Sequence, residues 1–280
     1  MLNTFSLSPN MSAYGLGTTS YWSGRNQGLD ACIHEAVEKY GISVLDTAEM
    51  YGNGRSEEAL GKTIRDMNRE TLFLVDKILP DNADEARFRN SLVNSLKRLK
   101  TDYLDLYLLH WRENADLSFV VPAMEAAVKE GLIRRWGVSN FDTHDLRDLL
   151  AVPGGANCFC NQIFYNVYER GCEYALVPLM KEHNILPMSY SSLGSNYYPH
   201  PDIHRIPPVM DVCRLGSLKP EALMLKWNVR HGFCTLFTTT SIQHLRDNLQ
   251  EIPEDIYQRF EQVIEQEFPA PDHEYPLVKI

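Results

Sequence analysis

The stretch LFLVDKILPDNADEARFRNSLVNSLKRLKTDYLDLYLLH, residues 72–110, contains the unit that repeats along this chain. It opens with the apolar run 72–77 and closes with the apolar run 103–110, and both have the length and composition of buried strands. Between them, apolar residues recur at helical spacing, at Phe88, Leu92, Leu96 and Leu99. Strands that are apolar on both faces lie in parallel sheets covered by helices, so the stretch predicts a strand–helix–strand unit.

The same alternation continues along the rest of the chain. Further strand-like runs lie at 13–17, 43–46, 136–139, 159–162, 185–190 and 233–239. Helical patterns lie at 33–40, 56–66, 118–130, 142–150, 174–183, 220–230 and 242–249. Eight strands, each followed by a helix and with no break in composition, predict an α/β fold. We expect a (β/α)8 TIM barrel formed as a single domain by residues 1–280.

Three segments fall outside this repeat. Ser8-Pro9-Asn10 predicts the turn of a short N-terminal hairpin. Residues 253–268 carry apolar side chains four apart and predict an extra C-terminal helix. The stretch 194–208 is rich in Tyr, His and Pro, and we expect it to be a loop.

Composition and charge argue against several classes of function. The 280 residues are 44% hydrophobic, and the net charge of −10 disfavours nucleic acid and anionic membranes as partners. Because no apolar run has the length of a signal peptide or a membrane span, we expect a cytoplasmic protein. The six cysteines suit neither a disulfide framework nor a zinc site. Pro199 and Pro201 argue against joint metal binding by His200 and His204, so we expect no metal.

Polar residues close the apolar runs, where a (β/α)8 barrel carries its active site. They are Asp46 with Tyr51 beyond it, Lys77, His110, Ser139 with Asn140, Gln162, and Tyr190 with Ser191. Any one of them alone is compatible with ordinary surface or core. If the barrel is correct, however, Asp46, Lys77 and His110 end three successive strands and converge.

Such a cluster has a definite chemistry. A buried lysine needs a carboxylate to keep its charge, and Asp46 is placed to supply it. The ammonium of Lys77 in turn favours the phenolate of Tyr51, so we expect the pKa of Tyr51 to be lowered. His110 is placed to donate a hydrogen bond to a substrate oxygen.

At these positions the chain resembles the aldo-keto reductase superfamily, and the resemblance spans Gly15 to about Asn248. The motifs, in order, are LDTAEMYGNG (45–54), VDK (75–77), DLYLLHW (105–111), GVSNF (137–141), NQ (161–162) and YSSLG (190–194). Within the superfamily, the run 104–111 and the closing FPAP (268–271) are most similar to bacterial reductases of small aldehydes such as methylglyoxal.

The resemblance implies an NAD(P)H-dependent enzyme that reduces small aldehydes or ketones to alcohols, with Tyr51 as general acid. It implies a catalytic tetrad of Asp46, Tyr51, Lys77 and His110. It implies that NADPH, or alternatively NADH, binds at Gly17, Thr18, Thr19, Asp46, Ser139, Asn140, Gln162, Tyr190, Ser191, Leu193, Gly194, Ser195, Thr238, Thr239, Ser241, His244 and Asn248. The substrate is expected at Trp22, Tyr51, His110 and Trp111, with Tyr197 and Tyr198 completing an aromatic rim.

Three departures from the superfamily pattern matter. Asp76 stands where Ser or Thr usually precedes the lysine, and strand alternation predicts that it faces away from Lys77. The loop YSSLG lacks the usual proline. The usual basic ligands of the cofactor 2′-phosphate are replaced by Thr238, Thr239, Thr240 and His244, so the preference for NADPH is expected to be modest.

We expect a monomer acting on a small carbonyl compound. One alternative is a cofactor-binding barrel with a regulatory or structural role and little turnover, because a fold alone does not establish activity. Another is a phosphate-binding lyase or isomerase. That enzyme would need basic residues after the last two strands, where this chain has Ser191, Ser192 and three threonines.

Overall fold

Eight parallel strands close into a barrel in the computed structural model, which describes residues 10–21 and 27–279. The strands are β1 Tyr14–Gly17, β2 Val44–Asp46, β3 Phe73–Ile78, β4 Leu104–Leu109, β5 Ile133–Ser139, β6 Cys160–Phe164, β7 Leu186–Tyr190 and β8 Cys234–Phe237. Each strand pairs with the next in sequence, and β8 pairs with β1 with Leu16 opposite Phe237. The predicted barrel is therefore confirmed.

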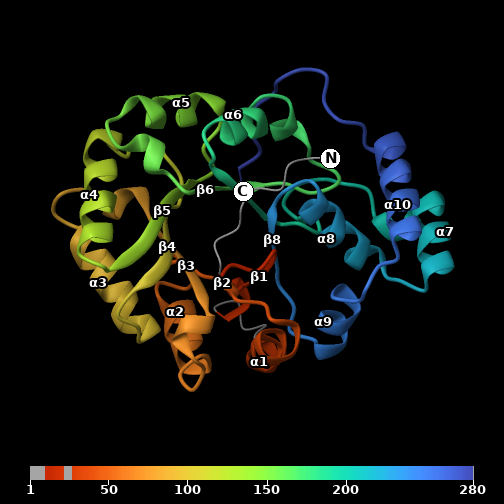
Figure 1. Cartoon of the computed structure of the whole chain (residues 1–280), viewed down its shortest axis with the longest axis horizontal. Coiled ribbons are helices and arrows are strands. Elements are labelled where there is room, and N and C mark those ends of the chain that lie inside the picture. Colours follow the sequence, from red (N-terminus) through yellow and green to blue (C-terminus); the bar gives the residue numbers. More distant parts are fainter. Residues whose placement is uncertain (1–9, 22–26, 280) are drawn as a thin grey trace.

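Helices surround the barrel as an outer ring (Figure 1). They are α1 Leu29–Tyr40, α2 Arg55–Thr63, α3 Phe88–Leu99, α4 Leu117–Lys129, α5 Thr143–Ala151, α6 Leu176–Glu182, α7 Pro207–Gly216, α8 Pro220–Arg230, α9 Ile242–Asn248 and α10 Glu254–Glu267. Local sequence explains where they begin. At α5, for example, the side chains of Asp142 and Asp145 each accept a backbone N–H of the other residue and form a capping box. The extra C-terminal helix is present as α10.

Strand alternation divides the apolar residues into two cores. Val44, Phe73 and Val75 belong to the cluster inside the barrel. Leu45 and Leu74, one residue away, belong to the larger cluster between the strands and the helices. Since side chains alternate along a strand, this parity fixes which later residues point inward.

The expected loop at 194–208 is wrong at its C-terminal end, because α7 begins at Pro207. Proline lacks an N–H, which makes it a breaker inside a helix but a favourable residue in the first turn. The buried Val209, Val212 and Cys213 of α7 also carry the helical spacing that indicates such an element. The expected N-terminal hairpin covers the first ten residues, and all of them except Asn10 lie outside the described residues.

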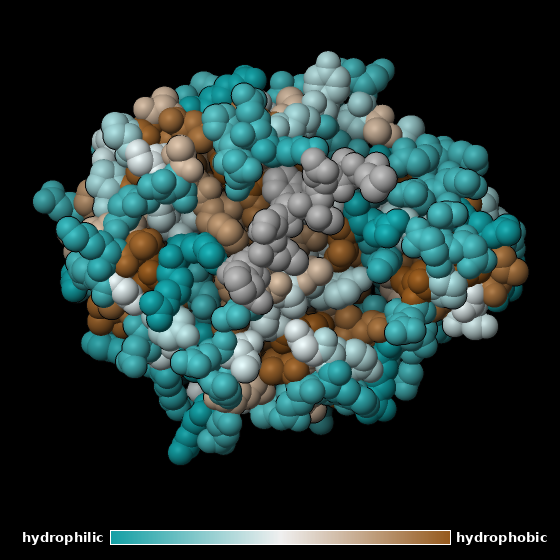
Figure 2. Space-filling model, in the orientation of Figure 1, coloured by the Kyte–Doolittle hydropathy of each residue, from teal (hydrophilic) through white to brown (hydrophobic). Residues whose placement is uncertain are grey.

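The surface in view is mostly hydrophilic at its outer rim, with apolar side chains in small separate groups (Figure 2). Within residues 10–21 and 27–279, no helix is long and apolar enough to cross a bilayer. The same part of the chain contains no group of three His, Cys, Asp or Glu side chains arranged to hold a metal ion.

Candidate active site

The inner parity of three neighbouring strands places the predicted tetrad, meaning Asp46, Tyr51, Lys77 and His110. Asp46 ends β2, and Lys77 follows the inward-facing Phe73 and Val75 on β3. His110 comes directly after β4, in phase with the inward-facing Leu106 and Leu108. Tyr51 lies in the turns between β2 and α2. The structure thus brings the four side chains to the C-terminal end of the barrel.

Lys77 is the centre of this arrangement. Its Nζ lies 2.6 Å from Asp46 Oδ1 and 2.9 Å from the Thr47 carbonyl oxygen, and it donates to the Tyr51 hydroxyl over 3.4 Å. Burial alone would lower the pKa of Lys77, but the Asp46 carboxylate and the Tyr51 hydroxyl outweigh it and the pKa is raised. Lys77 therefore carries a full positive charge inside the barrel.

Tyr51 differs from the expectation in its acidity. Lys77 does lower the pKa of Tyr51, but burial raises it more and Asp46 raises it further, so the net shift is upward. The low dielectric of the interior destabilises the Tyr51 phenolate more than the Lys77 ammonium stabilises it, because Lys77 is already paired with Asp46. The predicted lowering is wrong for this structure, and Tyr51 holds its proton at neutral pH.

His110 is held in the neutral form. Burial, with a further contribution from the Lys77 charge, lowers the pKa of His110 to about 2. Its ring packs edge-on against Tyr51, with centroids 5.9 Å apart, and lies 4.4 Å from the Trp111 ring. No group among the described residues hydrogen-bonds to the buried Nδ1 of His110 or to Nε1 of Trp111.

An amide-rich cluster adjoins the tetrad at the ends of β5 and β6. Gln162 Nε2 donates to Asp46 Oδ2 over 2.8 Å, so Asp46 accepts from both Lys77 and Gln162. The Ser139 hydroxyl donates to the Gln162 carbonyl oxygen over 2.8 Å. Asn140 has a φ of 60° and donates to the His110 carbonyl oxygen over 3.1 Å. These bonds join the predicted cofactor residues Ser139, Asn140 and Gln162 to the tetrad.

Tyr190 and the loop that follows it continue the same surface. The Tyr190 hydroxyl donates to Asn140 Oδ1 over 2.7 Å, and its ring packs against Phe164 at 5.7 Å. Ser191 has a φ of 51°, which turns the chain sharply after β7. The remaining predicted residues of this loop are half-buried: Leu193, Gly194 and Ser195.

The predicted cofactor residues after β1 and β8 contact each other through a hydrogen bond from a side chain to a backbone carbonyl oxygen. A side chain at Gly17 would lie 2.9 Å from Thr238 Oγ1, and that hydroxyl donates to the Gly17 carbonyl oxygen over 3.1 Å. Thr18 Oγ1 donates to the Asp46 carbonyl oxygen over 3.0 Å, which connects this end to the tetrad. Thr19 is exposed.

Residues 238–248 are called the β8 segment below. Thr239 Oγ1 accepts from the Ser241 N–H over 3.2 Å, and Ser241 Oγ accepts from the His244 N–H over 3.3 Å. His244 is exposed, whereas Asn248 is buried. The β8 segment therefore combines the exposed His244 with the buried Thr239 and Asn248.

The predicted substrate residues have mixed outcomes. Trp111 lies beside His110, whereas Trp22 falls outside the described residues. Tyr197 is 89% exposed, and its place in an aromatic rim stays a prediction. Tyr198 packs on Phe164 and donates to Glu169 over 3.0 Å.

The sequence of residues 14–265 matches the family model for the aldo/keto reductase family. The chain belongs to that family. This makes it an NAD(P)H-dependent oxidoreductase, as predicted. Methylglyoxal reductase YeaE of Escherichia coli is 34% identical over 242 residues, which cover 86% of this chain and 84% of that protein.

Solved structures agree with the family assignment. An aldo/keto reductase from Klebsiella pneumoniae in complex with NADP and acetate superposes with a TM-score of 0.89 at 33% identity, covering 96% of both chains. A second reductase from the same organism, in complex with NADPH, has a TM-score of 0.82 at 34% identity. It covers 96% of this chain and 95% of its own.

The structure of this reductase also shows buried polar residues that the sequence patterns did not single out. Glu49 Oε1 accepts from the Leu79 N–H over 2.7 Å and from Asn82 over 3.0 Å, and its other oxygen bonds Ser91. Glu49 therefore ties the turn that carries Tyr51 to the chain after β3. Its place in the motif at 45–54 is the signal that identifies it.

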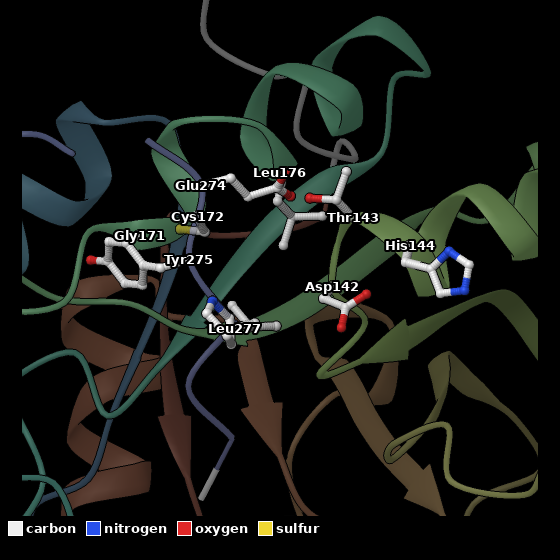
Figure 3. A pocket seen from close by; sticks show the side chains of 10 residues that line it. Asp142, Thr143, His144, Gly171, Cys172, Leu176, Glu274, Tyr275 and Leu277 are labelled. Atoms are coloured by element: carbon white, nitrogen blue, oxygen red, sulfur yellow. The ribbon is translucent and has the colours of Figure 1, made fainter. Parts of the chain in front are cut away.

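A pocket of about 360 Å³ lies between the start of α5 and the C-terminal segment of the reductase, away from the tetrad (Figure 3). Asp142 and His144 lie on one side of it, and Cys172 lies on the other side with Gly171 and Tyr275. A Cβ at Gly171 would lie 2.3 Å from the Tyr275 ring, so a side chain there would displace that ring. None of the tetrad or predicted cofactor residues lines this pocket, and we do not assign the chemistry to it.

Proposed function

We propose that this reductase converts small aldehydes to alcohols with NADPH, and that Tyr51 is the general acid. The observation that carries the proposal is the position of Lys77 Nζ, which contacts Asp46 and Tyr51 together beside a neutral His110. Support also comes from YeaE, a methylglyoxal reductase, and from the Klebsiella pneumoniae neighbours that hold NADP or NADPH.

The roles of the four side chains follow from their protonation states. Tyr51 holds a proton at neutral pH and so has one to give to a carbonyl oxygen that gains negative charge. The charged Lys77, fixed by Asp46, stabilises the phenolate that Tyr51 then becomes. Neutral His110 has one ring N–H, which we assign to orienting the carbonyl oxygen.

The residues present fit a reduced nicotinamide. The Ser139 hydroxyl and the Asn140 and Gln162 amides supply donors and acceptors of the kind that a carboxamide pairs with. The buried, unpartnered Nδ1 of His110 and Nε1 of Trp111 indicate that a polar ligand is expected beside them. When bound, the cofactor would supply the hydride, and Ser139, Asn140, Gln162 and Tyr190 would hold it.

The neighbourhood of the tetrad favours an uncharged substrate. Trp111 and Tyr51 supply aromatic surface around His110, and the positive charge of Lys77 is already neutralised by Asp46. The net charge of −10 adds a weak repulsion of anions, which salt screens. Methylglyoxal and aromatic aldehydes are therefore favoured over glucuronate or open-chain glucose.

The test measures turnover of a panel of substrates by the purified full chain. Turnover is monitored as the loss of NADPH absorbance. We expect kcat/KM to be at least tenfold higher for methylglyoxal or a nitrobenzaldehyde than for glucose or glucuronate. A protein that binds NADPH but turns over none of the panel would overturn the proposal in favour of a regulatory or structural barrel. Tighter binding of NADH than of NADPH would overturn the cofactor assignment alone.

A further inference from the structure

Asp76 lies back to back with Lys77 on β3 and is completely buried. It shares the outward parity of Leu74, so its carboxyl group lies between the strands and the helices rather than inside the barrel. Lys77 faces the opposite way, where Asp46 already takes its charge. The charge of Lys77 lowers the pKa of Asp76 less than burial and Glu57 raise it.

The side chain that meets Asp76 is another buried carboxyl group, that of Glu57 on α2. Arg98 on α3 neutralises Glu57 in bidentate fashion, with Nε 2.7 Å from Oε2 and Nη2 3.1 Å from Oε1. One guanidinium balances one carboxylate, so Glu57 is the ionised partner. Arg98 also attracts Asp76, so a second negative charge on Asp76 would have to share the guanidinium that Glu57 already occupies.

The other ionisable groups near Asp76 do not relieve it. Glu49 adds negative charge near Arg98, and Tyr107 on β4 is uncharged because burial raises its pKa. Two buried carboxylates in direct contact cannot both be charged at neutral pH, so a proton must lie between them. Consistently, burial and then Glu57 raise the pKa of Asp76 well above its ordinary value.

The two oxygens of Asp76 show where that proton lies. Oδ1 accepts the backbone N–H of Lys77 over 2.9 Å. No N–H or other donor of the described residues reaches Oδ2, which is the behaviour of an oxygen that is itself a donor. Both Glu57 oxygens accept hydrogen bonds from Arg98, and they are the acceptors available to the proton on Asp76 Oδ2.

We propose that Asp76 is a neutral carboxylic acid that donates its proton to Glu57 and positions Lys77 through the Lys77 backbone N–H. The chain of contacts runs from Arg98 through Glu57 and Asp76 to the residue that touches Tyr51. Ionisation of Asp76 would set two negative charges against each other, push its side chain away and release the Lys77 amide. Asp76 is a positioning residue, and this role rests on the proposed function of Lys77.

The decisive measurement is the protonation of Asp76, which does not depend on activity. Infrared difference spectra of the full chain at pH 7 should contain the carbonyl band of a protonated carboxyl group, and Asp76→Asn should remove it. Asp66→Asn, at a highly exposed aspartate, is the matched control and should leave the band unchanged. A spectrum in which Asp76→Asn removes no such band would overturn the proposal.

Unfolding by urea gives the second measurement. The folded chain keeps a proton on Asp76 that the unfolded chain has released, so raising the pH above about 4 favours unfolding. The unfolding constant of the wild type should therefore rise relative to that of Asp76→Asn, by up to tenfold for each pH unit. Glu57→Gln, which removes the facing charge, should reduce this rise. A wild-type to Asp76→Asn ratio that stays constant from pH 5 to pH 8 would contradict a shared proton.

Kinetics then test the positioning role. Asn presents a neutral side chain with an oxygen for the Lys77 N–H and a donor for Glu57, so Asp76→Asn should keep kcat within about twofold. Asp76→Ala has neither group and should lose tenfold or more in kcat with the KM for NADPH unchanged. Equal kcat for the two variants would overturn the role. If the wild type reduces no aldehyde, the proposed function fails, whereas the infrared and urea measurements still decide the state of Asp76.

Discussion

The tetrad and the β8 segment hold their polar groups in different ways. In the tetrad, Lys77 and Asp46 are buried and lie 2.6 Å apart, and Gln162 donates a hydrogen bond to the second oxygen of Asp46. In the β8 segment, the hydroxyls of Thr239 and Ser241 bond the backbone of their own segment over 3.2–3.3 Å. His244 stands exposed beside them.

This difference separates a site fixed by folding from one that remains adaptable. Buried charges interact strongly and must be paired, so the tetrad geometry is set by the fold itself. Exposed groups are screened by water and exchange partners at little cost. Substitutions in the tetrad should therefore have large effects, and those in the β8 segment small ones.

The largest expected effect is that of Tyr51→Phe, which keeps the ring and removes the proton. We expect kcat to fall by a factor of about 10² to 10⁴, with the dissociation constant of NADPH within about twofold of wild type. Stopped-flow turnover and fluorescence titration measure the two quantities. Tyr174→Phe, at a 51% exposed tyrosine outside the predicted site, is the matched control and should behave as wild type. Turnover within twofold of wild type for Tyr51→Phe would falsify the acid assignment.

The next effect is on stability. Lys77→Met leaves Asp46 buried with Gln162 as its remaining side-chain partner, and breaking a buried pair in this way costs about 3 to 5 kcal/mol. Urea unfolding at pH 7 measures the free energy of unfolding. The exposed Lys62 on α2 supplies the control, since Lys62→Met should change it by less than about 0.5 kcal/mol. Similar values for the two variants would mean that the tetrad is not held by this pair.

The sequence predicts those features of the fold and the site that follow from its periodicity. The barrel and the convergence of Asp46, Lys77 and His110 follow from apolar runs and strand parity, which are local patterns. The start of α7 does not follow from these patterns, because the prolines at 207 and 208 favour a loop in the stretch 194–208, although proline also begins helices.

Quantities that depend on several elements at once were not accessible from the sequence. The acidity of Tyr51 depends on the balance between burial and a Lys77 charge already shared with Asp46. The contact of Asp76 with Glu57 joins β3 to α2, and no sequence motif predicts it. Spacing along the chain gives no measure of burial or of contacts between distant elements, because both are properties of the packed molecule.

A smaller effect is the pH dependence of stability that His110 imposes. Folded His110 takes up a proton only near its lowered pKa of about 2, whereas the unfolded chain takes one near 6.5. The unfolded state then binds more protons below pH 6.5, so stability is lost as the pH falls through that value. Between pH 7 and pH 5.5 the loss should be about 1 kcal/mol, measured as the difference between wild type and His110→Gln.

The control for His110 is His144, an exposed histidine at the start of α5. His144→Gln should keep the pH dependence of the wild type, because an exposed ring is hydrated in both states. If His110→Gln retained the full acid sensitivity while His144→Gln lost it, the neutral His110 of the buried site would be wrong.

The smallest effect should come from the β8 segment. His244→Ala removes an exposed imidazole, and we expect the dissociation constant of NADPH to rise by about two- to fivefold, because solvent screens such a group. The dissociation constant of NADH, which lacks the 2′-phosphate, should not change, and Gln243→Ala on the same helix is the control for non-specific effects. Fluorescence titration with both cofactors measures the ratio. A hundredfold loss of NADPH affinity in His244→Ala would show that this imidazole becomes buried against the phosphate. The β8 segment would then be a second built site rather than an adaptable one, and the contrast with the tetrad would disappear.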